Sequence, residues 1–484
     1  MNSYLSQLSP AFITLAEEIG QLPDSNGVIK RDAGKLLPEI VRSIQYHAFK
    51  ALPPLIEGSM ATTSISLDKN HYTPSNQYNT DAFKYVVHIE RAFFKLVDSG
   101  YIQIVTKGWQ DRTTGRSDNT KYRLTAMFKQ WLVKQLKEIG FTGKLYTLVV
   151  DPLLMPKEPV LRVQSRNKDD LSLREPRTKR LLFKTTPETE SITSDVCRIN
   201  KLLSKTWIDL DLTKPQWEEL KRRLSEHKKK DKPTFIRYNN RQLYRVFNDT
   251  DFSTGGRYYG GWWETIPNNG SKGTQFRRHL VINGKATVEI DYSGLHPAIL
   301  YAKEGMTLSQ DPYTPILGKK YRDVSKRILN ALINSKQDME SGPRNLKFRF
   351  DDQPLTWGKI KEKVNDLHSP ISKYFCTGAG MWLMHEDSLL ATKVMHHFAK
   401  YGIPCLPVHD SFIMHHGYEN ELRDKMNEFF EERYGVKSKI KNEEVIFYRD
   451  EKDFNTKHAL EDVIAGYDLP QENRLNEFRV LLNI

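Results

Sequence analysis

Hydrophobic positions near residue 90 repeat with the spacing of an amphipathic helix. Between Thr80 and Val97, apolar side chains recur at intervals of three and four residues, namely Val86, Ile89, Phe93 and Leu96. Thr80 and Asp81 are suitable first residues, because their side chains accept hydrogen bonds from the first backbone amides of a helix. The pattern predicts a helix over residues 80–97, and residues 1–150 as a whole are expected to be mostly helical.

After this helix the pattern changes to that of two short strands. Ser99-Gly100-Tyr101 predicts a turn, and the stretch from Ile102 to Val105 has the composition of a strand. A polar, basic loop over residues 107–121 leads to a second predicted strand, Tyr122–Thr125. Helix, turn, strand, basic loop and strand resemble a winged helix, which implies either DNA contact through the helix and the wing or a protein-binding role. Residues 1–150 are therefore assigned to a winged-helix-like accessory domain.

The remaining chain divides by composition. Prolines and positive charges dominate residues 151–190, which are expected to form a basic linker or a strap over the surface. Helical patterns follow over Ser191–Lys205 and Lys214–Lys230. Residues 449–484 are charged and predict a C-terminal helical extension.

Composition limits the class of protein. The chain has 484 residues, of which 38% are hydrophobic, and it carries no long uncharged apolar run, so neither a disordered chain nor a membrane-spanning protein is expected. Its three cysteines form no Cys-x-x-Cys pair, and its first residues do not resemble a signal peptide. A reducing, cytoplasmic setting is expected. The net charge of +13 favours a polyanionic partner such as nucleic acid.

Two segments in the second half place an aspartate at the end of an apolar strand. The β-branched run 286–293 contains Asp291, and an apolar helix follows it from Ala298. In residues 403–414, two short apolar runs flank His409-Asp410, which predicts a hairpin with the aspartate at its tip. Aspartates on neighbouring strands provide the oxygen ligands that hold a pair of Mg²⁺ ions, the arrangement used for in-line phosphoryl displacement.

Two further segments carry cations. Residues four apart set polar groups on one broad helix face, namely Arg322, Lys326, Asn330 and Asn334. Such a row can bind a triphosphate, although it is also typical of a solvated surface. In the glycine-rich stretch 254–263, Arg257 can reach a phosphate and the aromatic residues can stack on bases.

Taken in order, these four segments resemble the signature motifs of the single-subunit right-hand polymerase superfamily. This superfamily contains the family A DNA polymerases and the phage and mitochondrial-type RNA polymerases. Asp291-Tyr292-Ser293 resembles motif A, residues 322–327 resemble motif B, His409-Asp410-Ser411 resembles motif C in its RNA polymerase spelling, and residues 256–259 resemble the Gly-Arg loop before motif A. The resemblance covers about Arg237 to Met414. It implies an α+β right hand, with thumb-like helices over 191–245 and palm and fingers over 246–448.

The resemblance also implies residue roles. Asp291 and Asp410 would be the metal ligands for two Mg²⁺ ions, with Mn²⁺ as a possible substitute, and Lys326 would contact the triphosphate and protonate the pyrophosphate leaving group. Other predicted contacts to nucleotide or nucleic acid involve Arg322 at the phosphates, Arg257 at the template or primer, His409 at the growing 3′ end, and His385 at the primer or incoming sugar.

Asn334, His296 and Tyr292 complete the predicted substrate-binding set, and they bear on the choice of sugar. Asn334 stands where the family places an aromatic residue that stacks on the incoming base, and His296 stands where DNA polymerases carry a glutamate that excludes a 2′-hydroxyl. His-Asp-Ser and the missing glutamate favour ribonucleotides, whereas Tyr292 favours the DNA branch. We therefore expect a DNA-dependent RNA polymerase, with a family A-like DNA polymerase without proofreading as the alternative.

A different class of function remains open. The winged-helix-like domain and the missing motif B aromatic also fit a DNA-binding replication initiator or regulator with an inactive polymerase-like core. A two-metal nuclease could use the same two aspartates, but that function would not explain the row of cations on the helix that begins at Arg322. Expected partners are a nucleic acid template, a primer or nascent strand, nucleoside triphosphates and accessory replication or transcription proteins, and the small size indicates a phage, plasmid or mobile-element enzyme.

Overall fold

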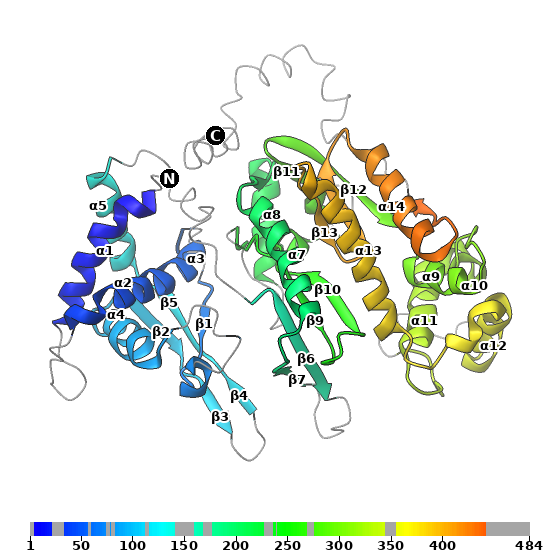
Figure 1. The fold of residues 1–484 in the computed structure, drawn as a ribbon, viewed down its shortest axis with the longest axis horizontal. Coiled ribbons are helices and arrows are strands. Elements are labelled where there is room, and N and C mark those ends of the chain that lie inside the picture. The colour runs from blue at the N-terminus through cyan, green and yellow to red at the C-terminus, as the bar shows by residue number, and fades with distance from the viewer. Residues whose placement is uncertain are drawn as a thin grey trace, which may run out of the picture.

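The computed structural model is an α+β protein. It describes residues 4–21, 33–56, 60–73, 78, 83–111, 116–140, 159–167, 177–226, 236–238, 240–268, 275–343 and 355–441. Figure 1 shows two groups of elements, one that runs from α1 to α5 and one that runs from β6 to α14. The predicted C-terminal extension 449–484 lies outside the described residues.

The N-terminal group packs helices against a small antiparallel sheet of order β1-β5-β2, from which the β3–β4 hairpin extends. Its elements are α1 (Tyr4–Gly20), α2 (Ala33–Lys50), α3 (Leu52–Ile56), β1 (Thr63–Ile65), the 3₁₀ turn η1 (Lys69–Tyr72), the π-helical segment η2 (Val86–Phe93), α4 (Phe94–Asp98), β2 (Ile102–Thr106), β3 (Trp109–Asp111), β4 (Arg116–Asp118), β5 (Thr120–Leu124) and α5 (Ala126–Glu138).

The predicted helix and both predicted strands of this group are confirmed within a few residues. The predicted cap residues Thr80 and Asp81 lie outside the described residues. The expected loop over 107–121 is wrong in part, because it contains the paired strands β3 and β4. Trp109 and Asp118 are opposite each other in that pair, so the wing is an ordered hairpin at its base.

A second sheet has the order β10-β9-β6-β7, in which β6 and β9 run parallel and the other pairs run antiparallel. The elements of this region are β6 (Leu161–Asn167), β7 (Arg177–Leu181), α7 (Pro187–Ser204), β8 (Ile208–Leu210), α8 (Lys214–Ser225), β9 (Tyr244–Phe247), β10 (Gly255–Tyr259) and the 3₁₀ turns η4 (Trp262–Thr265) and η6 (Phe276–His279).

Residues 151–190 are therefore not only a linker, since they provide β6 and β7 and the start of α7. The reason lies in the alternation within β6. Leu161 and Val163 are buried and pack with Phe247 and Phe252, while the residue between them, Arg162, stays half-buried on the other face. A strand in which buried and exposed side chains alternate can carry several positive charges, provided that they lie on its exposed face.

The third sheet has the order β13-β14-β12-β11-β8, and β15 pairs with β12. The remaining elements are β11 (Leu280–Ile282), β12 (Lys285–Tyr292), α9 (Leu295–Lys303), α10 (Thr314–Leu317), η7 (Lys319–Tyr321), α11 (Arg322–Asn334), α12 (Trp357–Leu367), η9 (Ser369–Tyr374), α13 (Gly380–Lys400), β13 (Leu406–Val408), β14 (Ser411–His415), α14 (Glu419–Tyr434) and β15 (Ile440–Lys441).

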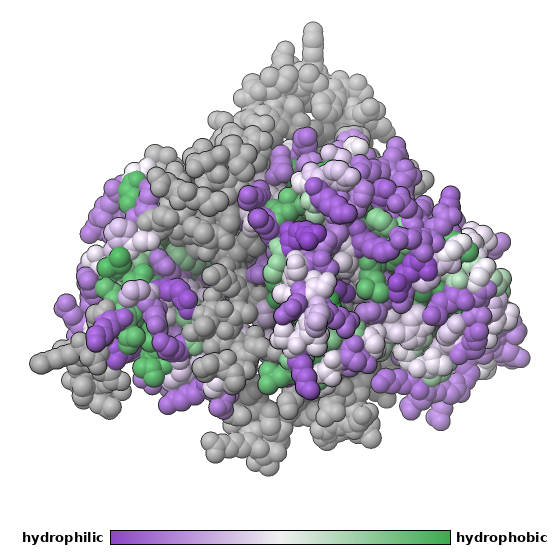
Figure 2. Space-filling model, viewed as in Figure 1, coloured by the Kyte–Doolittle hydropathy of each residue, from purple (hydrophilic) through white to green (hydrophobic). Residues whose placement is uncertain are grey.

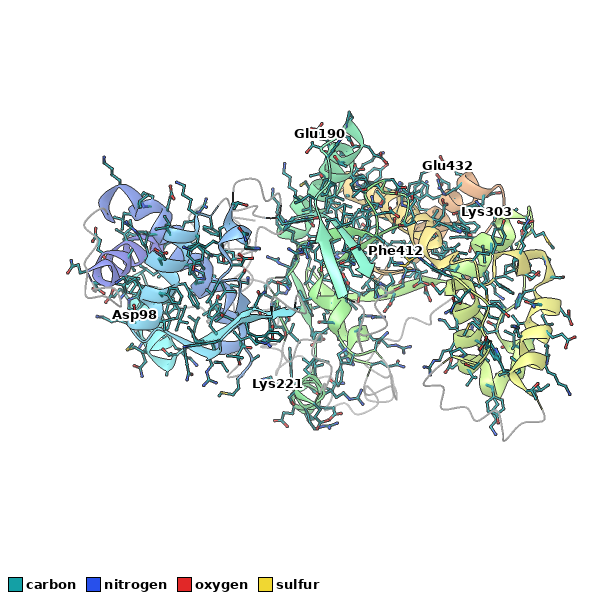
Figure 3. The ribbon with its side chains drawn as sticks, turned by 90° about the horizontal axis from the view of Figure 1, so that it is seen from below. Asp98, Glu190, Lys221, Lys303, Phe412 and Glu432 are labelled. Atoms are coloured by element: carbon teal, nitrogen blue, oxygen red, sulfur yellow. The ribbon has the colours of Figure 1, made fainter. Side chains whose placement is uncertain are left out.

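The long helix α13 joins the second and third sheets. The hydroxyl groups of Tyr258 on β10 and Thr392 on α13 are 2.8 Å apart, and α13 also contacts β13. In addition, the indole of Trp263 in η4 donates a 3.1 Å hydrogen bond to the carbonyl of Pro407 in β13. In Figure 3, Phe412 of β14 lies within this C-terminal group, while Asp98 lies in the N-terminal group. The two sheets are thus parts of one packed body around α13.

One face of the molecule is mostly polar where its residues are described. Figure 2 shows hydrophilic residues over much of the viewed face, with smaller hydrophobic areas among them. Within the described ranges, no helix combines the length and the apolar character that a membrane crossing requires.

Candidate active site

The register of the third sheet brings Asp291 and Asp410 together. Asp291 on β12 lies opposite Ser411 on β14, and Asp410 is the residue immediately before Ser411. The backbone N–H of Tyr292 donates to the carbonyl of Asp410 over 3.4 Å. Directly opposed residues in an antiparallel pair have Cα atoms about 4.5–5.5 Å apart, so the two aspartates are close neighbours at one end of the sheet. The predicted adjacent strands and the predicted hairpin are confirmed.

The hairpin turn itself is strained. Val408 and Ser411 form the last pair of β13 and β14, so His409 and Asp410 make a two-residue loop. His409 has a φ of +59°, a region that glycine usually occupies at the first position of such turns. A non-glycine residue costs about 1–2 kcal/mol there. Strained backbone of this kind gathers at functional sites, and here it lies directly beside Asp410.

A buried ion pair supports the two strands next to the aspartates. Glu289 lies two residues before Asp291, so both side chains share the half-exposed face of β12. Arg277 donates to both carboxylate oxygens of Glu289, at 2.8 and 2.7 Å, and the Oγ of Ser411 donates to Oε1 of Glu289 over 2.6 Å. The side chains of Arg277 and Glu289 are only 16% and 13% exposed. Sequence reasoning missed this pair, although the period of two from Asp291 is a usable signal for Glu289.

Tyr313 connects the aspartates to the cationic helix. Burial, and then the negative charge of Asp410, raises the pKa of its hydroxyl, against a lowering effect of Arg322. A Cβ at Gly294, three residues after Asp291, would lie 3.2 Å from that hydroxyl. The guanidinium of Arg322 lies 5.1 Å from the centre of the Tyr313 ring, and the Nζ of Lys326 lies 5.9 Å from it. The start of α11 and the turn after Asp291 therefore border the same tyrosine.

Arg322 and Lys326, the two cations of α11 that lie over Tyr313, differ in their surroundings. Arg322 forms a two-point ion pair with Asp311, with N···O distances of 3.1 and 2.7 Å. Lys326 is exposed, and among the residues that the structure describes it forms no ion pair within 4.0 Å. Of these two cations, Lys326 is therefore the more accessible to an anionic ligand, whereas Arg322 would have to exchange or share its partner.

Arg257 belongs to a second buried network. It donates to both oxygens of Asp387 on α13, and its Nη2 lies 3.1 Å from Nε2 of His296 on α9, which in turn lies 3.0 Å from Oδ2 of Asp387. The Asp387 side chain is 1% exposed. Burial alone would lower the pKa of Arg257, but the hydrogen bond and charge of Asp387, together with the charge of Asp410, raise it overall. Two residues further along β10, the ring of Tyr259 lies 6.1 Å from that of His409, so the strand that carries Arg257 borders the hairpin tip.

A bulge in β10 makes this network possible. The ladder between β9 and β10 shifts register between Gly255 and Arg257, and Gly256 has a φ of +86°. A Cβ at Gly256 would lie 2.9 Å from Oγ of Ser388 and 3.0 Å from Nη2 of Arg245. Only glycine fits between β10 and α13 at this point. The glycine-rich segment therefore approaches α13 closely at Gly256.

Three predicted site residues lie elsewhere. Tyr292 is 1% exposed on the buried face of β12, and its hydroxyl donates to the carbonyl of Met426 on α14 over 2.8 Å, so its surroundings do not support the predicted substrate contact, which stays a prediction. His385 lies beside β9, with its ring 6.2 Å from that of Phe247. Asn334 is at the far end of α11 from Arg322, about 18 Å away at 1.5 Å per residue.

Asn334 has a local packing role that the motif did not suggest. Its Nδ2 donates a 2.7 Å hydrogen bond to the carbonyl of Asn330, and its amide packs so closely against Gly380 that no Cβ fits there. It thereby joins the end of α11 to the start of α13. The interpretation that it replaces a base-stacking aromatic residue stays a prediction.

The donor set fits hard divalent cations. No group of three or more His, Cys, Asp or Glu side chains is arranged as a metal site within the described ranges. Mg²⁺, however, keeps several waters and is usually bound by one or two carboxylates plus substrate phosphates. Asp291 and Asp410 provide such a pair, and Glu289 is already held by Arg277.

Comparison with known proteins does not place the chain in a family. No protein-family model matches the sequence, and no curated protein matches it either.

Proposed function

We propose that the protein is a template-directed nucleic acid polymerase that adds nucleoside triphosphates to a 3′-hydroxyl. The observation that carries this proposal is the pairing of β12 with β14, which sets Asp291 beside Asp410. The cationic start of α11 lies over the ring of Tyr313, and the hydroxyl of Tyr313 lies beside Gly294 in the turn after Asp291. Adjacent carboxylates facing a cationic helix suit phosphoryl transfer, because the reaction needs charge stabilisation and positioning more than covalent catalysis. A right-hand layout of palm, fingers and thumb goes with this function.

The residues divide the work by position. Asp291 and Asp410 would hold two Mg²⁺ ions, which supply Lewis-acid activation of the attacking and leaving oxygens. Lys326 binds the triphosphate and gives a proton to the leaving pyrophosphate, and Arg322 supports the phosphates. His409 faces the growing 3′ end from the hairpin tip. Arg257, held by Asp387, contacts the template or primer strand.

RNA synthesis on a DNA template is the preferred form of this activity. His296 stands where a DNA polymerase would carry a glutamate, and its Nε2 is 3.0 Å from Asp387 and 3.1 Å from Arg257. A glutamate in that place would put a second negative charge beside a buried carboxylate. A family A-like DNA polymerase without proofreading is the alternative, and the two are separated by supplying each nucleotide set.

The N-terminal group fits a nucleic-acid-binding accessory domain. Its sheet order β1-β5-β2, the helix before β2 and the β3–β4 hairpin between β2 and β5 are the parts of a winged helix. This group supports a second candidate function, a DNA-binding initiator or regulator with an inactive core. The position of Asn334, away from the aspartates, also favours that candidate, because a stacking residue for the incoming base is then missing.

An incorporation assay tests both candidates. The full chain is given labelled ribonucleotides or deoxyribonucleotides with Mg²⁺ or Mn²⁺, on primed and unprimed DNA and RNA templates. We expect incorporation that Asp291→Asn and Asp410→Asn each reduce by more than about a hundredfold, since metal-ion catalysis is worth several kcal/mol. Asp338→Asn is the matched control, because Asp338 is 72% exposed and pairs only with Lys361 among the described residues. DNA binding without any incorporation would overturn the polymerase and support the regulator.

A further inference from the structure

The β10-β9-β6-β7 sheet has one buried face and one face that is partly open. Arg245 and Tyr258 are opposite each other in the β9–β10 pair and are each 3% exposed, against α13. The next pair along the same two strands, Tyr244 and Tyr259, is half-buried. Because side chains alternate along a strand, this second pair lies on the opposite, more open face.

On that face, four side chains form a continuous row. The guanidinium of Arg162 lies 3.4 Å from the ring centre of Tyr244, the rings of Tyr244 and Tyr259 are 6.2 Å apart at an angle of 30°, and the rings of Tyr259 and His409 are 6.1 Å apart. We call Arg162, Tyr244, Tyr259 and His409 the aromatic row. It begins on β6 and ends at the residue that precedes Asp410, so it runs from the second sheet to the candidate active site.

The backbone holds the middle of the aromatic row in place. Gly260 follows β10 with a φ of +110°, and a Cβ there would lie 2.9 Å from both Cδ1 and Cε1 of the Tyr244 ring. The ring therefore packs against bare backbone on the side of Gly260 and against the guanidinium of Arg162. A tyrosine fixed in this way loses little conformational freedom when a ligand stacks on the row.

We propose that the aromatic row binds a single-stranded segment of nucleic acid by base stacking and leads it to the hairpin tip. Rings and guanidinium planes accept any base, and they require bases that are not hidden in a duplex. Arg162 adds a positive charge beside the phosphates, in a chain whose net charge is +13. The direction toward Asp410 rests on the proposed polymerase function, whereas the binding itself does not.

The test measures binding without chemistry. Fluorescence anisotropy of labelled oligo(dT) and oligo(rU) is followed with the full-length chain, in a metal chelator and without nucleotides. Tyr244→Ala and Tyr259→Ala should each weaken binding about tenfold, because stacking is worth about 1–3 kcal/mol per base. Tyr244→Phe and Tyr259→Phe should bind like the natural protein. Tyr401→Ala is the control, since Tyr401 is 67% exposed and lies beyond the end of α13.

An additional variant, Arg162→Lys, keeps the test decisive if the alanine variants fail to fold. Arg162→Lys keeps the charge but loses the planar group, so it should weaken strand binding while leaving its salt dependence unchanged. The proposal is overturned if the aromatic row variants bind single strands as the natural protein does. It is also overturned if they lose blunt duplex binding to the same degree, or if the natural protein binds no single strand.

The outcome is separable from that of the polymerase proposal. The Asp291→Asn, Asp410→Asn double variant should incorporate nothing and still bind oligo(dT) normally, because the aromatic row is intact. If the natural protein binds strands through the row but never incorporates a nucleotide, only the polymerase function fails. If it incorporates nucleotides and the row variants bind and extend normally, only the present inference fails.

Discussion

Ser411 and Glu289 are joined by a 2.6 Å hydrogen bond between the serine Oγ and the carboxylate Oε1, across the two strands that carry Asp291 and Asp410. Glu289 is at the same time held by Arg277, so a hydroxyl, a carboxylate and a guanidinium lock β12 to β14 on the face of the aspartates. The serine of the His-Asp-Ser motif therefore has a structural role, which is to connect β14 to Glu289 on β12.

Ser411→Ala should lower both stability and activity. The hydroxyl donates to a charged group in a half-buried site, and such hydrogen bonds are worth about 1.5–3 kcal/mol. We expect a loss of that size in the free energy of unfolding, measured by urea titration, and slower nucleotide incorporation because the aspartate pair is less firmly held. Ser372→Ala is the control, since its hydroxyl bonds to the Ser369 carbonyl at an exposed site. Equal losses in the two variants would contradict this role.

Asp387→Ala should be more damaging than loss of an exposed carboxylate. It would leave Arg257 and His296, whose side chains are 19% and 17% exposed, without the carboxylate that both contact. Removing one member of a buried ion pair costs about 3–5 kcal/mol. The expected result is a clear drop in the denaturation midpoint.

The exposed pair of Asp338 and Lys361 gives the comparison, because Asp338→Ala should cost less than about 1 kcal/mol. Asp387→Asn keeps the shape of the side chain and should fold, but it should raise the KM for the nucleic acid substrate through misplaced Arg257. An Asp387→Asn variant with natural stability and natural KM would show that the network does not position Arg257.

Local patterns in the sequence were enough to find the aspartates, because each signal is contained in one strand and its turn. The strand before Asp291 and the hairpin around Asp410 are both read from short apolar runs, and the structure has both. The same alternation that leaves Asp291 half-exposed puts its neighbour Tyr292 on the buried face, so the strand period alone predicts the burial of Tyr292.

Other features depend on contacts between distant segments. Asp387 meets Arg257 across 130 positions of sequence and Ser411 meets Glu289 across 122, and no local spacing encodes either contact. Residues 161–167 were read as part of a linker because their charges hide a weak alternation, which only becomes a strand when Phe247 on β9 covers it. Burial and pairing supplied by the rest of the chain decided both cases.

Acid should destabilise the N-terminal group through His47. This histidine is buried, its Nε2 lies 2.9 Å from the carbonyl of His88, and burial lowers its pKa to about 3. The folded state therefore binds fewer protons than the unfolded state, whose histidine has a pKa near 6.5. The stability that neutral His47 contributes is full above about pH 6.5 and is lost as the pH falls toward 3.

Urea titrations at a series of pH values measure this effect. The slope from His47 alone should reach about 1.4 kcal/mol per pH unit within that window. The pKa of His88 is also lowered, by burial and then by His47, so His47→Gln should make the slope shallower without removing it. If the unfolding free energy changes with pH equally steeply in His47→Gln and in the natural protein, His47 does not contribute to the loss of stability in acid.

Lys326 should matter for catalysis far more than its neighbouring cations on the same surface. Lys326→Ala removes both a triphosphate contact and the proposed proton donor to pyrophosphate, and a positioned general acid contributes about a hundredfold or more. Lys326→Arg keeps the charge but gives up a proton far less readily, so it should hold the KM for nucleotide near the natural value and still lower kcat. Lys320→Ala is the charge-matched control, since Lys320 is exposed in η7 and its Nζ lies over the ring of Tyr321. Steady-state incorporation with each variant separates the two roles. If Lys326 only binds the triphosphate, Lys326→Ala raises the KM for nucleotide and Lys326→Arg stays fully active. If Lys320→Ala lowers activity as much as Lys326→Ala does, Lys326 contributes only to the general positive charge of the surface.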